Sequence, residues 1–386
     1  MSRIKKITVT EYQYELENFG AAIYFYEKGG RLSVTRYMVT VETDDGLRGD
    51  YAPHYGATSN AMAQTLRMAP MLLGRNPEHR VAIYEDLKIA FRHFDRVGIA
   101  ALDTALWDLA GKKYGVSIAA MLGGFRDRLP VYASTYPGQR QPGGLNSAEA
   151  YADFAEDCKA RGFPAFKIHG IRDGNADTEV EIMTAVKDRV GNGMKLMTDP
   201  ACSLKTYADA VHVGCACDDL GYFWYEDPYR DAGTSAFSHK RIREKIRTPL
   251  LVSEHIRGVE QKADFALNGG TDIIHIDPEL DGGVTGTLKI AQFADAIGMD
   301  VQLHTAGPMH RQCMAAIPNT YFYELALVGP GRCNGFQPPI YACGYGDQLD
   351  DVESDGCLPV PQGPGLGVTY DRDKLSGWET ARHVIE

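Results

Sequence analysis

Acidic and basic side chains recur at the ends of short apolar segments in the second half of the chain. Lys167 and His169 end the segment FPAFKIHG. The later segments MKLMTDP, GYFWYEDP, LLVSEH, TDIIHIDP, DVQLHTAG and NTYFYELALVG each contribute one further residue, in chain order Asp199, Glu226, Glu254, Asp277, His304 and Glu324. If each segment is one strand of a parallel barrel, these side chains converge on one mouth, where the active sites of such barrels lie.

Three of these residues are carboxylates on consecutive segments, namely Asp199, Glu226 and Glu254. One acid at a strand end is usually a cap or an ion-pair partner, whereas three buried together would repel one another. A divalent cation removes that repulsion. An all-oxygen ligand set favours Mg²⁺, with Mn²⁺ as a substitute, over zinc, whose sites usually include His or Cys. We therefore predict one Mg²⁺ per subunit at these three acids.

Strand alternation predicts which side chains share a face. Lys167 and His169 are two positions apart, so both are expected to point into the barrel while their apolar neighbours meet the surrounding helices. The same rule places Val252 on the face of Glu254. These inward faces would bring a fixed positive charge and an imidazole to the mouth.

Asp277 and His304 end adjacent segments, so we expect them to pair. In such a dyad the carboxylate orients the imidazole and stabilises its protonated form. The simpler interpretation, that His304 only ends a strand, is less favoured because Lys167 and His169 face it.

The elements that position these residues fall into three parts. Residues 31–51 predict two strands broken at the turn Asp44-Asp45-Gly46, and residues 79–123 predict helices, so residues 1–125 form an α+β capping domain. From residue 126 to 340, strand-like and helix-like stretches alternate, which predicts a parallel (β/α)7-8 TIM-type barrel. The Gly- and Pro-rich segment 341–386 is expected to return to the capping domain, giving an α/β chain with a cap built from both ends.

The composition excludes several classes. The net charge of −11 does not favour nucleic acid or an anionic membrane surface as a partner. The 8 cysteines are scattered, and no apolar run has the length of a signal peptide or a membrane span. We therefore expect a cytoplasmic protein with reduced thiols. The segment VYAST (131–135) has no H-x-H motif, which argues against a zinc hydrolase on a similar barrel.

The sequence resembles the mandelate racemase and muconate lactonizing enzyme branch of the enolase superfamily over nearly its whole length. ALDTALWDLAGKKYGVSIAAMLGG (101–124) is similar to the branch's signature between cap and barrel, and PQGPGLGVTYD (361–371) to its C-terminal return. Lys167-Ile168-His169 matches the Lys-x-Lys of the racemase-like subgroup. The remaining matches are the metal ligands Asp199, Glu226 and Glu254, the dyad of Asp277 and His304, and the eighth-strand acid Glu324.

The resemblance implies a common first step. Mg²⁺ and Lys167 would hold the substrate carboxylate, a base would take the proton alpha to it, and the metal would stabilise the enediolate. Glu324 would act as a general acid or as a hydrogen-bond donor to the enediolate oxygen. His169 replaces the more common lysine, which leaves open whether His169 or His304 is the base; we interpret His169 as the base and His304 as the acid.

The subgroup's acid-sugar dehydratases use positive groups on two sides of the substrate together with an Asp–His dyad. We therefore predict a lyase, a Mg²⁺-dependent dehydratase that converts a sugar acid, an aldonate or an aldarate, to a 2-keto-3-deoxy acid. One alternative is a racemase or epimerase of a 2-hydroxy acid that transfers a proton between His169 and His304. A more remote alternative is a non-catalytic relative that binds a sugar acid.

Polar residues in the loops after these segments are candidate contacts for a small carboxylate substrate, although residues of this kind are usually solvated. They are His54 and Tyr55 in GDYAPHYG, Arg140, His255, His310 and Arg311. We also expect a homo-oligomer.

Overall fold

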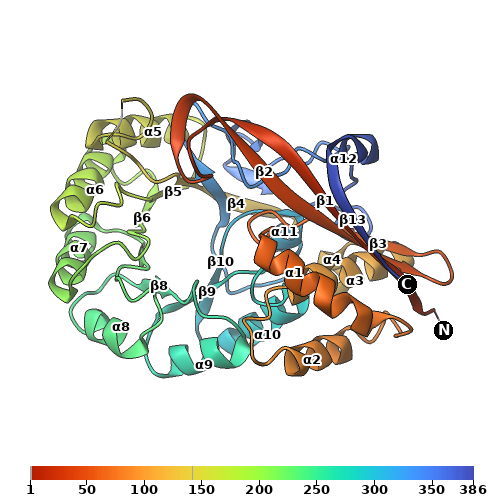
Figure 1. The fold of residues 1–386 in the computed structure, drawn as a ribbon. Coiled ribbons are helices and arrows are strands. Elements are labelled where there is room, and N and C mark those ends of the chain that lie inside the picture. The colour runs from red at the N-terminus through yellow and green to blue at the C-terminus, as the bar shows by residue number, and fades with distance from the viewer. Residues whose placement is uncertain (1, 141) are drawn as a thin grey trace.

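The computed structural model describes residues 2–140 and 142–386, and it places an antiparallel sheet beside a ring of parallel strands (Figure 1). The antiparallel sheet has the strand order β13-β1-β2-β3. Its strands are β1 (Ile4–Phe19), β2 (Tyr26–Thr43), β3 (Arg48–Tyr51) and β13 (Glu379–Ile385). Gly46 has a φ of 85° in the turn between β2 and β3, a left-handed conformation that glycine adopts without strain. The cap sheet therefore combines both ends of the chain, as the sequence predicts.

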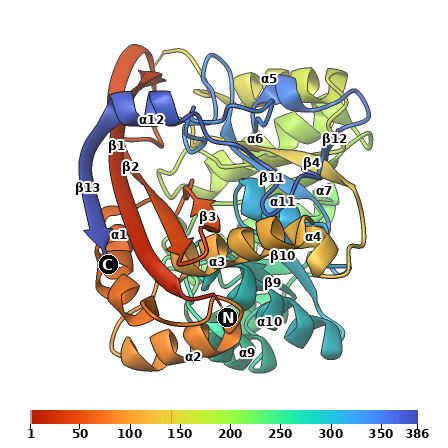
Figure 2. The same ribbon diagram turned by 90° about the vertical axis from the view of Figure 1, so that its right-hand side faces the viewer.

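Helices join this sheet to the barrel, and Figure 2 shows them around the lower end of the long β1–β2 hairpin. They are α1 (Ser59–Met68), the short 3-10 helix η1 (Ala69–Leu72), α2 (Arg80–Ala90), α3 (Ile99–Tyr114) and α4 (Ile118–Met121). Helix α3 is the central one. Most of its residues are buried, because it packs between the cap sheet and α10 of the barrel. It ends at Gly115, whose φ of 70° provides the left-handed C-cap.

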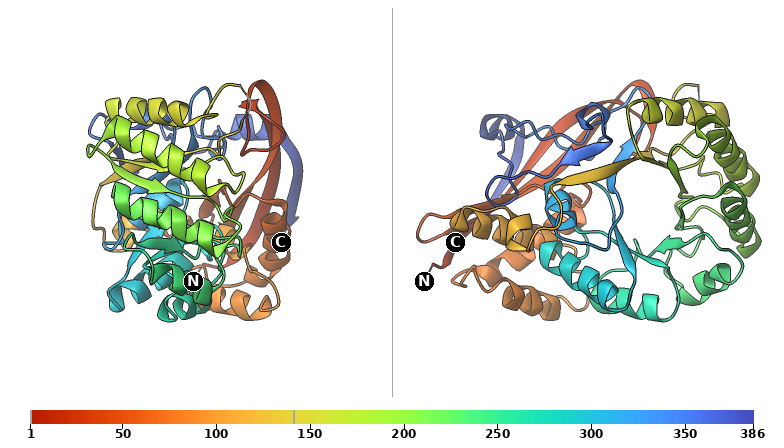
Figure 3. Two further views of the ribbon diagram at one scale, coloured as in Figure 1. Left: turned by 90° about the vertical axis from the view of Figure 1, so that its left-hand side faces the viewer. Right: turned by 180° about the vertical axis from the view of Figure 1, so that it is seen from behind.

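Eight parallel strands form the barrel, in the order β10-β9-β8-β7-β6-β5-β4-β11. They are β4 (Arg128–Thr135), β5 (Ala165–Ile168), β6 (Lys195–Thr198), β7 (Trp224–Glu226), β8 (Leu250–Val252), β9 (Ile273–Ile276), β10 (Asp300–Leu303) and β11 (Tyr323–Val328). Between β10 and β11 the connection is a bridge from Val301 to Thr320, and the Gln302 side chain donates a hydrogen bond to the Phe322 carbonyl at 2.6 Å. The strands therefore enclose a ring, as the view from behind in Figure 3 shows.

Helices cover the outside of this ring. They are α5 (Ala148–Ala160), α6 (Ala176–Val190), α7 (Tyr207–Leu220), α8 (Ala236–Arg243), α9 (Val259–Leu267), α10 (Gly283–Ala296) and α11 (Pro308–Met314). The first four begin with a side-chain cap, in which Ser147, Asn175, Thr206 and Ser235 accept hydrogen bonds from the first turn. Seven strand–helix units followed by a final strand agree with the predicted (β/α)7-8 architecture.

The C-terminal segment contacts both parts of the molecule. The 3-10 helix η2 (Leu349–Asp351) is followed by β12 (Cys357–Pro359), which pairs antiparallel with β4 of the barrel. Helix α12 (Arg372–Trp378) and β13 then reach the cap, where β13 pairs with β1. The division into 1–125, 126–340 and 341–386 stays a prediction.

The interior of the ring is filled by apolar side chains below the polar mouth. This inner layer is formed by Tyr132, Ala165, Met197, Trp224, Leu251 and Ile273. Val252 belongs instead to the larger core that the helices cover. The prediction that Val252 shares the face of Glu254 is therefore wrong. Strand β8 ends at Val252, and Ser253 takes a φ of 96°, which interrupts the alternation before Glu254.

Two further findings concern the whole chain. All eight cysteines lie in the described residues, and each is a free thiol. Over the same residues, 2–140 and 142–386, no helix is long and apolar enough to cross a membrane.

Candidate active site

Lys167 lies at the centre of the polar mouth. Its side chain is 1% exposed, and its Nζ lies 2.7 Å from Glu226 Oε1, 3.1 Å from Glu324 Oε1 and 3.5 Å from Asp199 Oδ2. Burial alone would lower the pKa of this ammonium group, but the negative charges of Glu226 and Glu324 outweigh burial and raise it. Lys167 is therefore a fixed positive charge that can bind a carboxylate.

The acids around Lys167 carry more negative charge than this one lysine neutralises. Burial raises the pKa of Asp199, but His169 and Lys167 outweigh it and hold the pKa well below its usual range. Burial and the neighbouring Asp199 raise the pKa of Glu226 although Lys167 opposes them. Trp224 Nε1 donates a hydrogen bond to Glu226 Oε2 at 3.0 Å and fixes that carboxylate. Such a set of acids provides a binding site for a cation.

The donor chemistry fits a divalent metal ion. Glu226 and Glu254 have oxygens that lie, together with a nitrogen of His275, within 4.8 Å of one another. Asp199 and Glu226 both lie within 3.5 Å of the Lys167 ammonium nitrogen. An ion that binds oxygen at about 2.1 Å has ligands about 3 to 4 Å apart, so small side-chain rotations would bring these acids around one position. Glu226 and Glu254 thus lie where they could share a cation, and Asp199 lies beside Glu226 at the same lysine.

His169 follows the end of β5 and faces the position that the cation would occupy. Its Nδ1 lies 2.7 Å from the Thr135 carbonyl oxygen at the end of β4, and a carbonyl only accepts, so Nδ1 carries the proton. Its Nε2 lies 2.8 Å from Asp199 Oδ2 and is the nitrogen that faces the site. The Thr135 hydroxyl also accepts a hydrogen bond from the His169 backbone N–H at 2.8 Å. Both contacts hold the ring with Nε2 directed into the mouth.

The dyad also forms. His304 Nδ1 lies 2.9 Å from Asp277 Oδ2, while Asp277 Oδ1 accepts hydrogen bonds from the backbone N–H groups of Glu279 and Leu280. Burial would lower the pKa of His304, but Glu254 and Asp277 outweigh it and raise the pKa to about 9. The His304 ring is therefore protonated at neutral pH, with Nε2 turned toward the site.

Glu324 is ionised in this arrangement. Burial raises its pKa, but Lys167 and His304 outweigh burial and lower the pKa to about 2. Its Oε2 also accepts a hydrogen bond from the Thr305 backbone N–H at 2.5 Å. Both roles predicted for Glu324, general acid and hydrogen-bond donor, would require it to take up a proton first.

Several of these side chains line a cavity of about 180 Å³, whereas Lys167, Glu226 and Asp277 are not part of its wall. Its wall consists of Tyr24, Tyr55, His169, Arg172, Asp199, Ala201, Glu254, His255, His304, Thr305, Glu324, Ala326, Leu327 and Phe336. Tyr55 and His255 therefore lie where the sequence predicts a substrate contact. Sequence reasoning missed Tyr24, Arg172 and Phe336. Arg172 could have been considered, because it follows the polar end of β5 by a few residues.

The other four predicted substrate contacts lie outside the cavity wall. His54 and His310 are fully buried, and burial lowers their pKa to about 3 and about 4, so both rings are neutral core residues. Arg311 is buried against Asp347 at 2.6 Å, and Arg140 forms an ion pair with Asp173 at 2.6 Å on the surface. Tertiary partners hold these four side chains away from the cavity wall, and their contacts with a substrate stay predictions.

The loop that carries Tyr55 is attached to the barrel by Glu279. This buried carboxylate accepts hydrogen bonds from the backbone N–H groups of His54 at 2.8 Å and Gly56 at 2.5 Å, and from the Tyr51 hydroxyl. A Cβ on Gly56 would lie 2.7 Å from the Glu279 Cβ, so only glycine permits this approach. The contacts set the Tyr55 ring edge-on to His304, with 4.6 Å between ring centroids.

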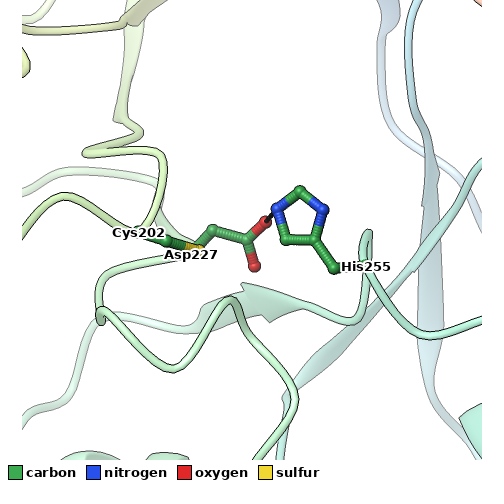
Figure 4. A group of neighbouring side chains, drawn as sticks. All are labelled: Cys202, Asp227 and His255. Carbon is green, nitrogen blue, oxygen red and sulfur yellow. Dashed lines mark ion pairs between the residues drawn. The ribbon is translucent and has the colours of Figure 1, made fainter.

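A second group of possible metal-binding side chains lies beside the mouth (Figure 4). Cys202, Asp227 and His255 have ligand atoms within 4.8 Å of one another. Burial and Asp227 raise the pKa of the Cys202 thiol. The Asp227 carboxylate instead lies 3.3 Å from His255 Nε2. We interpret the group as an ion pair that holds His255 at the cavity wall.

A buried lysine beneath the site fixes the backbone of two strand ends. Lys262 of α9 is fully buried, and its Nζ donates hydrogen bonds to the carbonyls of Ser253 and His275, at 2.5 Å in both cases. It also lies 3.1 Å from Asp281 Oδ2, which in turn accepts a hydrogen bond from the Asp277 backbone N–H at 2.8 Å. Lys262 therefore supports the residue before Glu254 and the acid of the dyad together.

We expect Lys262→Met to lower the free energy of unfolding by about 3–5 kcal/mol, because it leaves the buried Asp281 without its counter-ion. Chemical denaturation measures the change. The matched control is Lys113→Met, which removes a partly exposed ion pair with Glu78 and is expected to cost about 1 kcal/mol or less. In the double variant Lys262→Met/Asp281→Leu, part of the loss should be recovered. A Lys262→Met protein as stable as the control would contradict this role.

Comparison with known proteins agrees with the fold. Residues 150–374 match the family described as enolase C-terminal domain-like, and residues 31–123 match the N-terminal domain of the mandelate racemase / muconate lactonizing enzyme family. The chain therefore belongs to the mandelate racemase/muconate lactonizing enzyme branch of the enolase superfamily, as its motifs suggest.

Sequence relatives of this chain have names that describe different reactions. The D-gluconate dehydratase of Thermoproteus tenax is 27% identical, over 92% of this chain and 71% of the relative. The D-galactarolactone cycloisomerase of Agrobacterium fabrum is 28% identical, over 88% of this chain and 90% of the relative. The crystal structure of D-glucarate dehydratase from Agrobacterium tumefaciens, complexed with magnesium, superposes with a TM-score of 0.84 at 24% identity, covering 98% and 99% of the two chains. That likeness supports the fold.

Proposed function

We propose that this chain is a hydro-lyase that dehydrates a sugar acid, an aldonate or an aldarate, to a 2-keto-3-deoxy acid. The observation that carries the proposal is the pair of histidines facing one cavity. His169 has a proton on Nδ1, and its Nε2, which pairs with Asp199 Oδ2 in this structure, would become free to accept a proton once Asp199 binds a cation. His304 is held in its protonated form by Asp277, so it can donate one. A base and an acid on two strands fit an elimination.

Asp199, Glu226 and Glu254 are the residues proposed to hold Mg²⁺, with Mn²⁺ as a substitute. When bound, the cation would draw electron density from the substrate carboxylate and make the alpha proton more acidic. Lys167 would bind the same carboxylate and balance the charge that develops on it. Its ion pairs with Glu226 and Glu324 keep the ammonium in place before the substrate arrives.

The proposed reaction then needs two proton transfers. His169 Nε2 takes the alpha proton, while its Nδ1–H stays hydrogen-bonded to the Thr135 carbonyl and keeps the ring oriented. His304 gives its Nε2 proton to the departing beta-hydroxyl, which leaves as water. The C–H and C–O bonds break, a C=C bond forms, and the resulting enol becomes the 2-keto acid. The similarity to the D-gluconate dehydratase of Thermoproteus tenax supports this outcome.

The same two histidines also permit the alternative reaction. A proton taken by one and returned by the other to the opposite face of the alpha carbon would racemise or epimerise a 2-hydroxy acid. A beta-hydroxyl within reach of His304 decides between the two outcomes, because only a substrate that carries one can eliminate water.

A panel of aldonates and aldarates incubated with the protein and Mg²⁺ tests the proposal. We expect at least one acid to yield a 2-keto-3-deoxy product, detected as a semicarbazone. If no acid in the panel yields a keto acid, while one enantiomer of a 2-hydroxy acid is converted to the other, the racemase alternative replaces the dehydratase. Binding without either conversion would favour a non-catalytic relative. Assembly into a homo-oligomer stays a prediction.

A further inference from the structure

His275 is a buried residue of the mouth to which the proposed reaction gives no role. It lies on β9 two residues before Asp277, and its side chain is fully buried. Within residues 2–140 and 142–386, neither of its ring nitrogens has a hydrogen-bond partner. Leaving a buried polar group without a partner costs about 1–3 kcal/mol. An imidazole held in this way is expected to have a partner that the protein chain itself does not supply.

The neighbours of His275 identify that partner by their chemistry. Its Nδ1 lies 3.7 Å from Glu226 Oε1, which is too long for a hydrogen bond. Ligand atoms of His275, Glu226 and Glu254 all lie within 4.8 Å of one another, and all three side chains are buried. In an octahedral site, neighbouring ligands are about 3 Å apart and opposite ligands about 4.2 Å apart, since each lies about 2.1 Å from the ion. The three groups can therefore meet one ion with small side-chain movements.

We propose that His275 contributes a nitrogen ligand to the divalent cation at Glu226 and Glu254, and that the site consequently binds Mn²⁺, Fe²⁺ or Co²⁺ more tightly than Mg²⁺. Imidazole suits these cations, whereas Mg²⁺ prefers oxygen. The inference rests on the proposed cation site, and it does not depend on which reaction the protein catalyses.

The neighbouring histidines are the natural controls. His304 Nε2 lies 3.4 Å from Glu254 Oε1, and His169 Nε2 lies 2.8 Å from Asp199 Oδ2, so each also stands beside a proposed metal ligand. His304 Nδ1 is occupied by Asp277, and His169 Nδ1 by the Thr135 carbonyl. His275 alone among these three has both nitrogens without a hydrogen bond in the described part of the chain.

Pulsed electron paramagnetic resonance of the Mn²⁺-loaded protein tests the assignment, because it detects a ¹⁴N nucleus bound directly to the metal. We expect that coupling in the wild-type protein and in the His304→Asn and His169→Asn variants, and its loss in His275→Gln. Competition titrations should show Mn²⁺ binding at least about tenfold tighter than Mg²⁺ in the wild type. This ratio should fall by about tenfold in His275→Gln.

Two results would overturn the proposal. One is a wild-type Mn²⁺ spectrum without directly bound nitrogen, together with an unchanged Mn²⁺/Mg²⁺ ratio in His275→Gln. The other is a coupling that survives in His275→Gln and disappears in His304→Asn. If His275→Gln does not fold, the experiment uses protein in which the histidines are labelled with ¹⁵N. The metal–nitrogen coupling must then change from that of ¹⁴N to that of ¹⁵N. The same coupling must persist in the labelled His304→Asn and His169→Asn variants.

The same experiment separates this inference from the proposed function. If Mn²⁺ shows directly bound nitrogen but the protein dehydrates no sugar acid, the proposed dehydration is contradicted and His275 as a metal ligand is supported. If the protein dehydrates a sugar acid but its metal has only oxygen ligands, the dehydration is supported and the His275 ligand is contradicted. Absence of any Mn²⁺ binding would remove the cation site and, with it, both proposals.

Discussion

Asp199→Asn is expected to reduce kcat for the proposed dehydration by at least about a thousandfold, which corresponds to about 4 kcal/mol of lost transition-state stabilisation. Asp199 is ionised because His169 and Lys167 hold its pKa well below the usual range. An amide in its place would keep the shape but remove the charge that a divalent cation requires. Chelation of the wild-type protein should abolish turnover in the same way, and added Mg²⁺ should restore it.

The measurement combines steady-state kinetics with isothermal titration of the metal. The matched control is Asp177→Asn on α6, whose side chain is 91% exposed and has no place in the mouth. This variant should keep wild-type kcat and wild-type metal affinity. Full activity of the Asp199→Asn protein in the presence of a chelator would exclude the proposed metal site.

The second large effect concerns the division of work between the two histidines. His169→Asn is expected to abolish both dehydration and exchange of the alpha proton with solvent deuterium, because it removes the proposed base. His304→Asn should abolish dehydration but keep some exchange, since it removes only the proton that the departing hydroxyl needs. General acid or base catalysis of this kind contributes typically 10²–10⁴-fold, which sets the expected size of each loss.

Mass spectrometry of substrate recovered from D₂O measures the exchange, and product formation measures dehydration. His212→Asn, which removes a half-exposed histidine on α7, is the control and should change neither. Exchange that survives without His169 and disappears without His304 would make His304 the base. An anti elimination would agree with two separate residues, whereas a syn elimination could use His304 alone.

Local rules in the sequence were sufficient for much of the fold. Asp44-Asp45-Gly46 indicates the turn between β2 and β3, and Gly115 ends α3, because both depend on conformations that neighbouring residues already determine. The alternation of Lys167 and His169 likewise depends only on the pleat of one strand. The same rule failed at Glu254, where the left-handed backbone of Ser253 interrupts the pleat.

Turn chemistry and strand alternation could not predict contacts between segments that are far apart in the sequence. The residue types of His54, His310 and Arg311 are compatible with a solvated loop, yet the structure buries all three. Arg172 reaches the cavity wall, while Arg140 is held by Asp173. The hydrogen bonds from Lys262 to two strand ends also depend on where α9 packs. The position of α9 against the strands could not be predicted from one sequence.

The sequence by itself determined the order of strands and helices and the chemical types of the residues that face the mouth, because periodicity and turn chemistry act over a few neighbouring residues. Only the tertiary structure decided their charge states and their partners. Lys167 stays charged because Glu226 and Glu324, far away in the chain, lie within about 3 Å of its ammonium group, and His304 is protonated because Asp277 and Glu254 flank it. Desolvation and Coulomb energies depend on distances in space, and the fold sets those distances.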